Sequence, residues 1–302
     1  MSLLVVGSVA FDAIETPHGK VGRTLGGAAT YFAMAASYFT PVRVVGIVGD
    51  DFTEEDEAAF HGRRIELTGL EHAPGKTFFW SGRYGQNMNE RTTLATDLNV
   101  FAKFNPTLPP SYRNSSFVFL GNIDPVLQRS VLKQVRTKPK VVGLDTMNYW
   151  ITGTPEELRE TLKQTHILMI NDEETRQLSG ERNLLHAAKR IFEMGPSTLV
   201  IKRGEHGALM VHKEFLFHAP AFPLEEVHDP TGAGDSFAGG FMGYLAGMGR
   251  VNEQALRRAM IYGSVLGSFA VERFGVERLT HLTRREITAR ARRFSDLTSF
   301  HL

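Results

Sequence analysis

The chain has 302 residues, of which 42% are hydrophobic, and its 34 basic residues nearly balance its 33 acidic residues. This composition is typical of a globular protein with a substantial core, and the formal net charge of +1 gives no reason to expect a nucleic-acid or membrane partner. The sequence contains no cysteine, which excludes disulfides, thiolate catalysis and cysteine metal sites.

The N-terminal segment, MSLLVVGSVAFD, contains a short apolar run that lacks a basic leader and ends at Asp12. We expect this run to form a first β-strand rather than a signal peptide. No uninterrupted apolar segment is long enough to span a bilayer. The sequence therefore predicts a cytoplasmic protein.

Short apolar runs alternate with helix-like stretches through the middle of the chain, and this alternation predicts an α/β protein with a parallel sheet covered by helices on both faces. Ligands of open α/β sheets bind at the carboxyl ends of the strands. Because strands also commonly end in polar turn residues, any one polar residue there has a simpler explanation. Four polar residues follow these runs and would share one edge of the sheet: Asn122, Asp145, Asn171 and Lys202.

The segment 77–98 departs from this pattern. Its first half alternates so that Phe78, Trp80 and Tyr84 lie on one face of a strand, and its second half alternates again after a polar connection. This pattern predicts a β-hairpin inserted into the α/β chain, either as an elaboration of the main sheet's edge or as a small lid. Its aromatic face would have to cover a ligand, a partner subunit or the body of the protein.

The stretch VHDPTGAGDSFAGGF, residues 227–241, places Asp235 directly behind Gly232-Ala233-Gly234 at the start of a predicted helix. The first N–H groups of a helix lack intrahelical partners, and glycines let a phosphate approach them closely, so the turn predicts an anion hole. The simpler alternative is a tight turn with Asp235 as the N-terminal cap. Small residues along the helix favour a buried helix start. We expect Asp235 to stay ionised there, with a depressed pKa, because the N–H groups favour the charged form.

On this stretch the chain resembles the ribokinase-like, PfkB-type kinases of sugars and nucleosides. Residues 229–237 match the family's C-terminal signature closely, and residues 26–33 match its N-terminal signature more loosely. The resemblance implies a ribokinase-like three-layer sandwich with a mainly parallel central sheet and a small β lid. It implies a single kinase domain over residues 1–302, with lid strands contributed by about 12–25 and 77–98. The implied activity is transfer of the γ-phosphoryl group of ATP to a hydroxyl of a sugar or nucleoside.

The resemblance also assigns roles to individual residues. Asp235 would be the catalytic base, and the amides of Gly232, Ala233 and Gly234 would form the anion hole. Asn171 and Glu174 match an Asn-x-x-Glu element that organises the Mg²⁺–ATP complex partly through water, although an ordinary acidic first turn of a helix is the alternative. The remaining positions are Lys202, Gly204, Gly207 and Gly263 for the nucleotide; Asp12, Gly26, Gly27, Thr30 and Asn122 for the acceptor; and Asp229 and Thr231 for an activating monovalent cation such as K⁺.

Two of the acceptor positions depart from the family's pattern. Thr30 stands where many sugar kinases carry Asn, and Asn122 stands near where ribokinases place a Glu. Both changes shorten the polar reach toward a sugar, so they argue against ribose without naming a replacement. Phe11, Trp80 and Tyr84 offer aromatic faces for a nucleobase, and packing explains them equally well. Lids of such kinases often pair between subunits, so the resemblance leaves a homodimer through the lid open.

Other enzyme classes have little support. No G-x-G-x-x-G follows the first strand, no G-x-x-x-x-G-K-[ST] occurs, and the 11 histidines show no H-E-x-x-H pattern. These absences argue against a dinucleotide-dependent oxidoreductase, a P-loop ATPase and a zinc hydrolase. The remaining alternative is a non-catalytic sugar- or nucleoside-binding sensor on the same fold. The joint presence of Asp235, the Gly-Ala-Gly turn and Glu174 favours the kinase.

Overall fold

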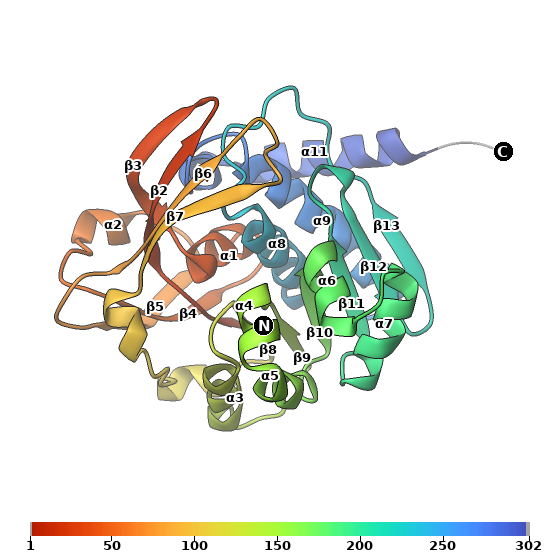
Figure 1. Cartoon of the computed structure of the whole chain (residues 1–302), viewed down its shortest axis with the longest axis horizontal. Coiled ribbons are helices and arrows are strands. Elements are labelled where there is room, and N and C mark those ends of the chain that lie inside the picture. Colours follow the sequence, from red (N-terminus) through yellow and green to blue (C-terminus); the bar gives the residue numbers. More distant parts are fainter. Residues whose placement is uncertain (1, 300–302) are drawn as a thin grey trace.

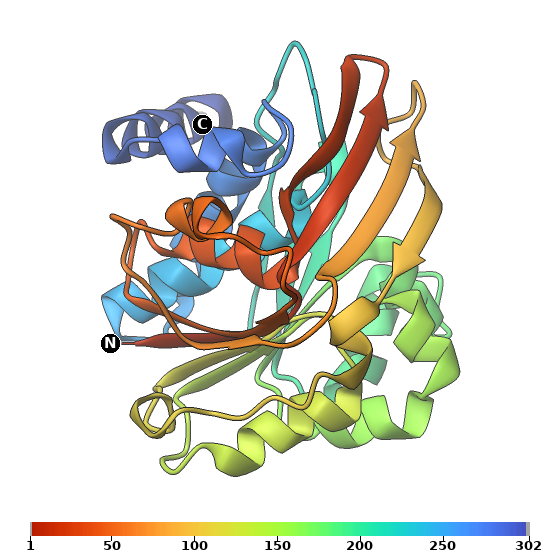
Figure 2. The ribbon, with the colours of Figure 1, turned by 90° about the vertical axis from the view of Figure 1, so that its left-hand side faces the viewer.

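The computed structural model describes residues 2–299, which form two β-sheets with helices packed around the larger one (Figures 1 and 2). The central sheet has nine strands in the order β13-β12-β11-β10-β9-β8-β1-β4-β5. The strands from β11 to β5 along this order are parallel, and β12 and β13 are antiparallel at one edge. The bounds are β1 (Leu3–Val6), β4 (Val42–Val48), β5 (Ile65–His72), β8 (Phe117–Leu120), β9 (Val141–Leu144), β10 (Ile167–Asn171), β11 (Thr198–Lys202), β12 (Ala208–His212) and β13 (Leu216–Ala219).

The central strands are apolar on both faces because helices cover both sides of the sheet. In β1, Leu3 and Val5 join one core cluster, whereas Leu4 and Val6 join the other. The first cluster lies under α1 (Ala28–Ala36), α2 (Glu54–Ala58), α8 (Ala233–Met248), α9 (Glu253–Ala270), α10 (Glu277–His281) and α11 (Arg284–Thr298). The second lies under α3 (Pro125–Gln134), α4 (Asn148–Gly153), α5 (Pro155–Leu162), α6 (Asp172–Ser179) and α7 (Leu184–Glu193), with two 3₁₀ turns, η1 (Asn99–Lys103) and η2 (Pro110–Tyr112). The predicted three-layer α/β sandwich is confirmed.

A second sheet of four strands rises from the central sheet (Figure 2), in the order β3-β2-β6-β7. Its strands are β2 (Ala10–Thr16), β3 (Gly19–Gly26), β6 (Phe78–Tyr84) and β7 (Arg91–Asp97), and β6 and β7 form the antiparallel hairpin expected at 77–98. We refer to these four strands as the small sheet. That it closes over a ligand stays a prediction. None of the helices that the structure describes is long and apolar enough to cross a bilayer.

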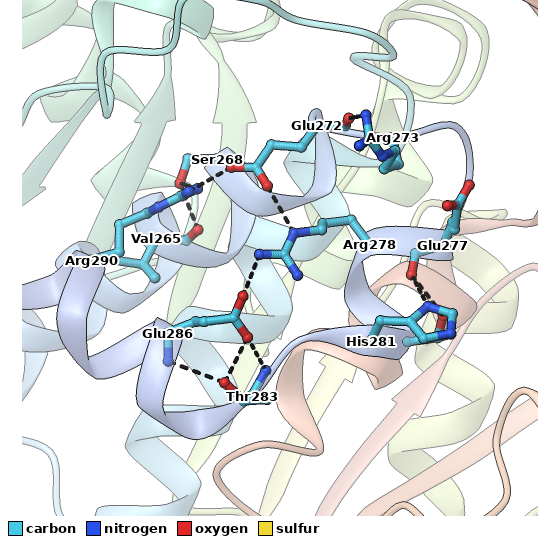
Figure 3. A network of polar contacts seen from close by, with 11 residues as sticks. Val265, Ser268, Glu272, Arg273, Glu277, Arg278, His281, Thr283, Glu286 and Arg290 are labelled. Carbon is cyan, nitrogen blue, oxygen red and sulfur yellow. Dashed lines mark hydrogen bonds and ion pairs between the residues drawn. The ribbon is translucent and has the colours of Figure 1, made fainter.

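The C-terminal helices are joined by a network of charged side chains (Figure 3). Glu272 accepts hydrogen bonds from Arg278 Nε at 2.8 Å and from Arg290 Nη2 at 2.5 Å, and Arg278 also bonds Glu286 at 2.7 Å. The Arg290 guanidinium lies 3.4 Å from the centre of the Phe269 ring. The network therefore joins α11 to the end of α9 and to α10, with arginine stacked on the core.

Replacing Arg290 by Met is expected to lower the free energy of unfolding by about 1.5–3 kcal/mol, because the change removes charged hydrogen bonds and leaves the half-buried Glu272 with one fewer partner. Urea unfolding monitored by circular dichroism measures the loss. Arg190→Met is the matched control, since Arg190 is exposed and its pairs with Glu181 and Glu193 are 3.6 Å long, and it should cost less than about 0.5 kcal/mol. Equal losses for the two variants would show that the network adds nothing beyond a surface pair.

Candidate active site

Polar side chains meet at the carboxyl edge of the central sheet, as the strand pattern predicts. Lys202 ends β11 and pairs in register with Asn171 at the end of β10. Its ammonium Nζ lies 3.0 Å from Oδ2 of Asp145, which follows β9. This ion pair is buried, with side-chain exposures of 19% for Lys202 and 9% for Asp145. Three adjacent strands thus contribute to one polar centre.

The turn before α8 borders this centre. Gly232 is the N-cap of α8 with a left-handed φ of 71°, and a Cβ there would lie 2.3 Å from Cγ of the Tyr31 ring. Only glycine avoids both the conformational strain and the clash. A Cβ at Gly234 would lie 3.2 Å from Lys202 Nζ, so the ammonium group sits directly against the turn. The N–H of Ala233 donates to the Pro230 carbonyl at 3.2 Å, which gives one of the three expected anion-hole amides a partner within the turn.

The conformational constraint at Gly232 can be measured by Gly232→Ala. A left-handed alanine costs about 1–2 kcal/mol, and the contact with Tyr31 adds to this cost, so we expect Gly232→Ala to destabilise the protein by more than about 2 kcal/mol. Gly180→Ala is the control, since Gly180 has a φ of 72° with nothing within 4 Å of its Cβ position. The difference in urea midpoints between the two variants measures the clash of the alanine Cβ with the Tyr31 ring. Equal midpoints would show that this clash costs no stability.

Asp235 lies in the first turn of α8, and its pKa differs from expectation. Burial raises the pKa of Asp235 to about 7, with the neighbouring Asp145 adding to the increase, whereas Lys202 and Arg91 lower it. The expected depressed pKa was wrong, because desolvation of the carboxylate outweighs the hydrogen bond from its own N–H. Nor is Asp235 the N-cap, since Gly232 occupies that position. A carboxyl group with a pKa near neutrality is well suited to accept a proton.

Asp12, which is predicted to bind the acceptor, lies in β2 of the small sheet and is 4% exposed. Its carboxylate covers Gly26, where a Cβ would come within 2.0 Å of Oδ2. Burial raises the pKa of Asp12 to about 8, with further increases from Asp229 and Asp235, and the N–H of Gly27 opposes this. Asp235 therefore influences Asp12 electrostatically although Asp12 comes from the small sheet and Asp235 from helix α8.

Asn171 and Glu174 form a reciprocal cap at the start of α6. Asn171 Oδ1 accepts from the Glu174 N–H at 2.7 Å, and Glu174 Oε2 accepts from the Asn171 N–H at 2.8 Å. This capping box accounts for both residue types on structural grounds alone. Glu174 nevertheless differs from an ordinary exposed capping residue. Burial raises the pKa of its carboxyl group to about 7; Lys202 opposes this increase and Asp145 adds to it. Its carboxylate therefore belongs to the polar centre.

The small sheet contacts the turn η3 (Gly204–His206), where two predicted nucleotide-binding glycines lie. Gly204 and Gly207 have positive φ values of 52° and 82°. Asn89, at the tip of the β6–β7 hairpin, donates from Nδ2 to Glu205 Oε1 at 3.0 Å. Gly263 has a different environment, inside α9, where a Cβ would lie 3.0 Å from the Phe237 carbonyl oxygen. Helix packing is sufficient to explain that glycine, and its role in nucleotide binding stays a prediction.

Asp229 and Thr231 stabilise the loop before α8. Asp229 Oδ1 accepts from the Thr231 N–H at 2.8 Å, and Oδ2 accepts from the Gly275 N–H at 2.9 Å. The Thr231 hydroxyl lies 3.1 Å from the Tyr84 hydroxyl of the small sheet. Their role in binding a monovalent cation stays a prediction. Within residues 2–299, no three acidic or histidine side chains cluster as a metal site.

Two predicted acceptor residues lie in less open surroundings than expected. Asn122 Oδ1 accepts a hydrogen bond from Trp150 Nε1 at 3.0 Å, so its carboxamide is held by a protein side chain. Thr30 is fully buried, and its hydroxyl has no hydrogen-bond partner among the described residues. The polar residues that follow the predicted strands indicated that Asp145 lies at this edge of the sheet, but they did not predict its ion pair with Lys202. Two further residues near the centre were not singled out from the sequence: Arg91 lies in no motif, and Tyr31 lies within the N-terminal signature at residues 26–33.

Comparison with known proteins agrees with this geometry. A family model described as pfkB family carbohydrate kinase matches residues 1–281. The chain is 29% identical over 253 residues to a cytidine kinase of Thermococcus kodakarensis, a match that covers 82% of this chain and 90% of the relative. It is 25% identical over 295 residues to a nucleoside kinase of Methanothermobacter thermautotrophicus, with 91% of each chain covered.

Solved structures show the same fold. The nucleoside kinase of Methanocaldococcus jannaschii superposes with a TM-score of 0.77 at 21% identity, over 97% of this chain and 98% of that one. The aminoimidazole riboside kinase of Salmonella enterica, complexed with aminoimidazole riboside and an ATP analogue, gives a TM-score of 0.75 at 21% identity, over 96% of this chain and 100% of that one. On the family match and these relatives, the chain belongs to the pfkB family of carbohydrate kinases, ATP-dependent phosphotransferases that act on an alcohol group.

Proposed function

We propose that this protein transfers the γ-phosphoryl group of ATP to a hydroxyl of a sugar or nucleoside, with Asp235 as the base and the turn at residues 232–234 as the anion hole. The observation that carries the proposal is the position of Asp235. It is a partly buried carboxyl group with a pKa raised to about 7, at the start of α8, next to a glycine turn that Lys202 borders. A sensor would need none of these features to bind a sugar.

The residues divide the chemistry among them. The acceptor hydroxyl gives its proton to Asp235 while its oxygen forms a bond to the γ-phosphorus, and the bond from that phosphorus to the bridging oxygen breaks to release ADP. The Gly232 and Gly234 amides and the Lys202 ammonium stabilise negative charge on the phosphoryl oxygens. Asp12 binds a further hydroxyl of the acceptor beside Gly26 and Gly27.

ATP and Mg²⁺ are the expected ligands. Glu174 is the carboxylate best placed to hold the ion, directly or through water, because its capping bond uses one of its two oxygens and it is buried next to Lys202. Asn171 supports it from the same turn, and the glycines of η3 would lie along the nucleotide. When bound, the ion neutralises phosphate charge. For Asp229 and Thr231, replacing K⁺ by Na⁺ in an activity assay tests the cation role.

The acceptor class can be narrowed by experiment. Because two relatives that cover most of the chain are named for cytidine and for nucleosides, cytidine is the first acceptor to test. ADP release should be measured with cytidine, other nucleosides, pentoses and hexoses, each with Mg²⁺ and ATP. Turnover with at least one acceptor supports the kinase, and binding without turnover across the panel would establish the sensor. Sedimentation of the protein tests whether the small sheet forms a dimer.

The pH dependence of turnover tests Asp235 directly. The base must be ionised to accept a proton, so kcat/KM for the acceptor at saturating Mg²⁺–ATP should rise with pH through a midpoint of about 7 and level off above it. Arg91→Gln removes a positive charge that lowers the Asp235 pKa, so its midpoint should lie at higher pH. A wild-type midpoint in the ordinary range of an aspartate, about 4, would contradict the buried base.

A further inference from the structure

Tyr31 has a buried hydroxyl group that lacks a hydrogen-bond partner. It lies in the first turn of α1, is 1% exposed, and is among the largest fully buried side chains. Within the described part of the chain, no atom hydrogen-bonds to its hydroxyl. Leaving a buried hydroxyl unpaired costs about 1–3 kcal/mol, and buried tyrosine hydroxyls usually find a partner. Phenylalanine would fill the same space without this cost, so packing alone does not explain a tyrosine here.

The surroundings of Tyr31 connect its side chain with the proposed site. Its ring packs against Gly232 of the anion-hole turn. Burial raises the pKa of the Tyr31 phenol well above its ordinary value, and the carboxylates of Asp12, Asp229 and Asp235 raise it further, with the largest effect from Asp12. The first of these is the predicted acceptor-binding residue and the last is the proposed base. The phenol therefore stays protonated and acts as a hydrogen-bond donor.

The acceptor needs donors as well as acceptors in this half of the site. Above about pH 8 both Asp12 and Asp235 are ionised and are acceptors only, and both would take hydrogen bonds from hydroxyl protons of the substrate. The oxygens of those hydroxyls keep lone pairs that need a donor once water is excluded. We propose that the Tyr31 hydroxyl donates a hydrogen bond to an oxygen of the acceptor, and so helps to select acceptors with a hydroxyl between Asp12 and Asp235. This inference rests on the proposed function and adds a binding residue to it.

Tyr112 provides a matched comparison. It is also fully buried, but its hydroxyl donates to the Glu66 carbonyl at 2.8 Å, and it lies under the opposite face of the sheet. Removing the Tyr112 hydroxyl therefore breaks a bond that stabilises the fold. Removing the Tyr31 hydroxyl breaks none among the described residues. Tyr112→Phe should thus lower stability and leave substrate binding unchanged, whereas Tyr31→Phe should weaken substrate binding without lowering stability.

The experiment compares Tyr31→Phe with Tyr112→Phe. Acceptor KM, ATP KM and kcat are measured with cytidine or, if cytidine is not turned over, with the best acceptor of the panel, and the melting temperature is measured without ligand. For Tyr31→Phe we expect the acceptor KM to rise about tenfold, the ATP KM to change less than about twofold, and the melting temperature to stay equal or rise. For Tyr112→Phe we expect a lower melting temperature and an unchanged acceptor KM.

Two results would overturn the inference while leaving the kinase intact. One is an active Tyr31→Phe variant with the wild-type acceptor KM. The other is a Tyr31→Phe variant whose melting temperature falls as far as that of Tyr112→Phe, since its hydroxyl would then have a structural partner. A wild-type protein that phosphorylates no member of the panel would overturn the proposed function itself, and this inference with it.

Discussion

Asp235→Asn is expected to lower kcat by about 10²–10⁴-fold, because the amide keeps the size of the carboxylate but cannot accept the proton of the acceptor hydroxyl. Binding of the acceptor and of ATP should change much less, since the anion-hole amides, Asp12 and Lys202 remain. The rate of ADP release at saturating substrates measures the effect. Isothermal titration with the acceptor measures the binding that is retained.

The melting temperature of Asp235→Asn shows whether a lower rate comes from unfolding. At pH values above about 7 the native protein holds Asp235 as a buried charge, which the raised pKa shows to be unfavourable. The neutral amide should therefore leave the melting temperature equal or higher, so a lost rate cannot be attributed to unfolding. Glu253→Gln is the matched control, since Glu253 is an exposed acid in the first turn of α9, and its rate should equal that of wild type. A slow but stable Asp235→Asn beside an unaffected control supports the base, and a fast Asp235→Asn excludes it.

Lys202→Met is expected to lower the free energy of unfolding by about 3–5 kcal/mol near pH 8, because it leaves a buried carboxylate cluster without its cation. Burial lowers the pKa of Lys202, but Asp145, Glu174 and Asp235 favour the charged ammonium and together raise that pKa above its ordinary value. Without Lys202, the carboxyl groups of Glu174 and Asp235 should titrate at higher pH, because Lys202 lowers the pKa of each. The loss of stability should accordingly shrink near pH 5, where the carboxyl groups are protonated in the variant.

Urea unfolding of Lys202→Met at both pH values measures this effect. The double variant Lys202→Met/Asp145→Asn should recover part of the loss, since it removes the carboxylate that lies 3.0 Å from the missing ammonium. Recovery at pH 8 but not at pH 5 would confirm that charge is responsible. A loss independent of pH, with no recovery in the double variant, would instead assign the effect to packing of the lysine side chain.

Local patterns were sufficient to predict much of this protein. Apolar runs of four or five residues can only be buried on both faces of a parallel sheet, and their polar ends therefore converge, as Asp145 and Lys202 do. The turn before Asp235 was recognisable from its glycines, and the structure adds that Gly232 has a left-handed φ of 71°. The hairpin at 77–98 was equally clear from its alternation. Each of these features depends on neighbours within a few residues.

Features that depend on distant contacts could not be predicted. The pKa of Asp235 depends on how deeply the helix start is buried and on Asp145 and Arg91, which lie far away in the sequence, so the local rule for helix N-termini gave the wrong direction. Asn122 appeared free to reach a ligand because nothing nearby suggested that Trp150 would hold it. Tyr31 was quoted only as part of the N-terminal signature, and its unpaired buried hydroxyl becomes visible only in the structure.

Helix α11 lies beyond residue 281, where the family match ends, yet ion pairs connect it to the loop behind the turn at residues 232–234. The ion pairs of Arg290 and Glu286 secure Glu272 and Arg278, and the loop between those two residues contains Gly275, whose N–H supports Asp229 behind the turn. Helix α11 therefore stabilises the loop that supports Asp229. Ending the polypeptide at residue 281 would remove Glu286 and Arg290 and with them the support of the proposed anion-hole turn. A ligand that binds α11, or a protease that cleaves it, would then change the rate of the enzyme.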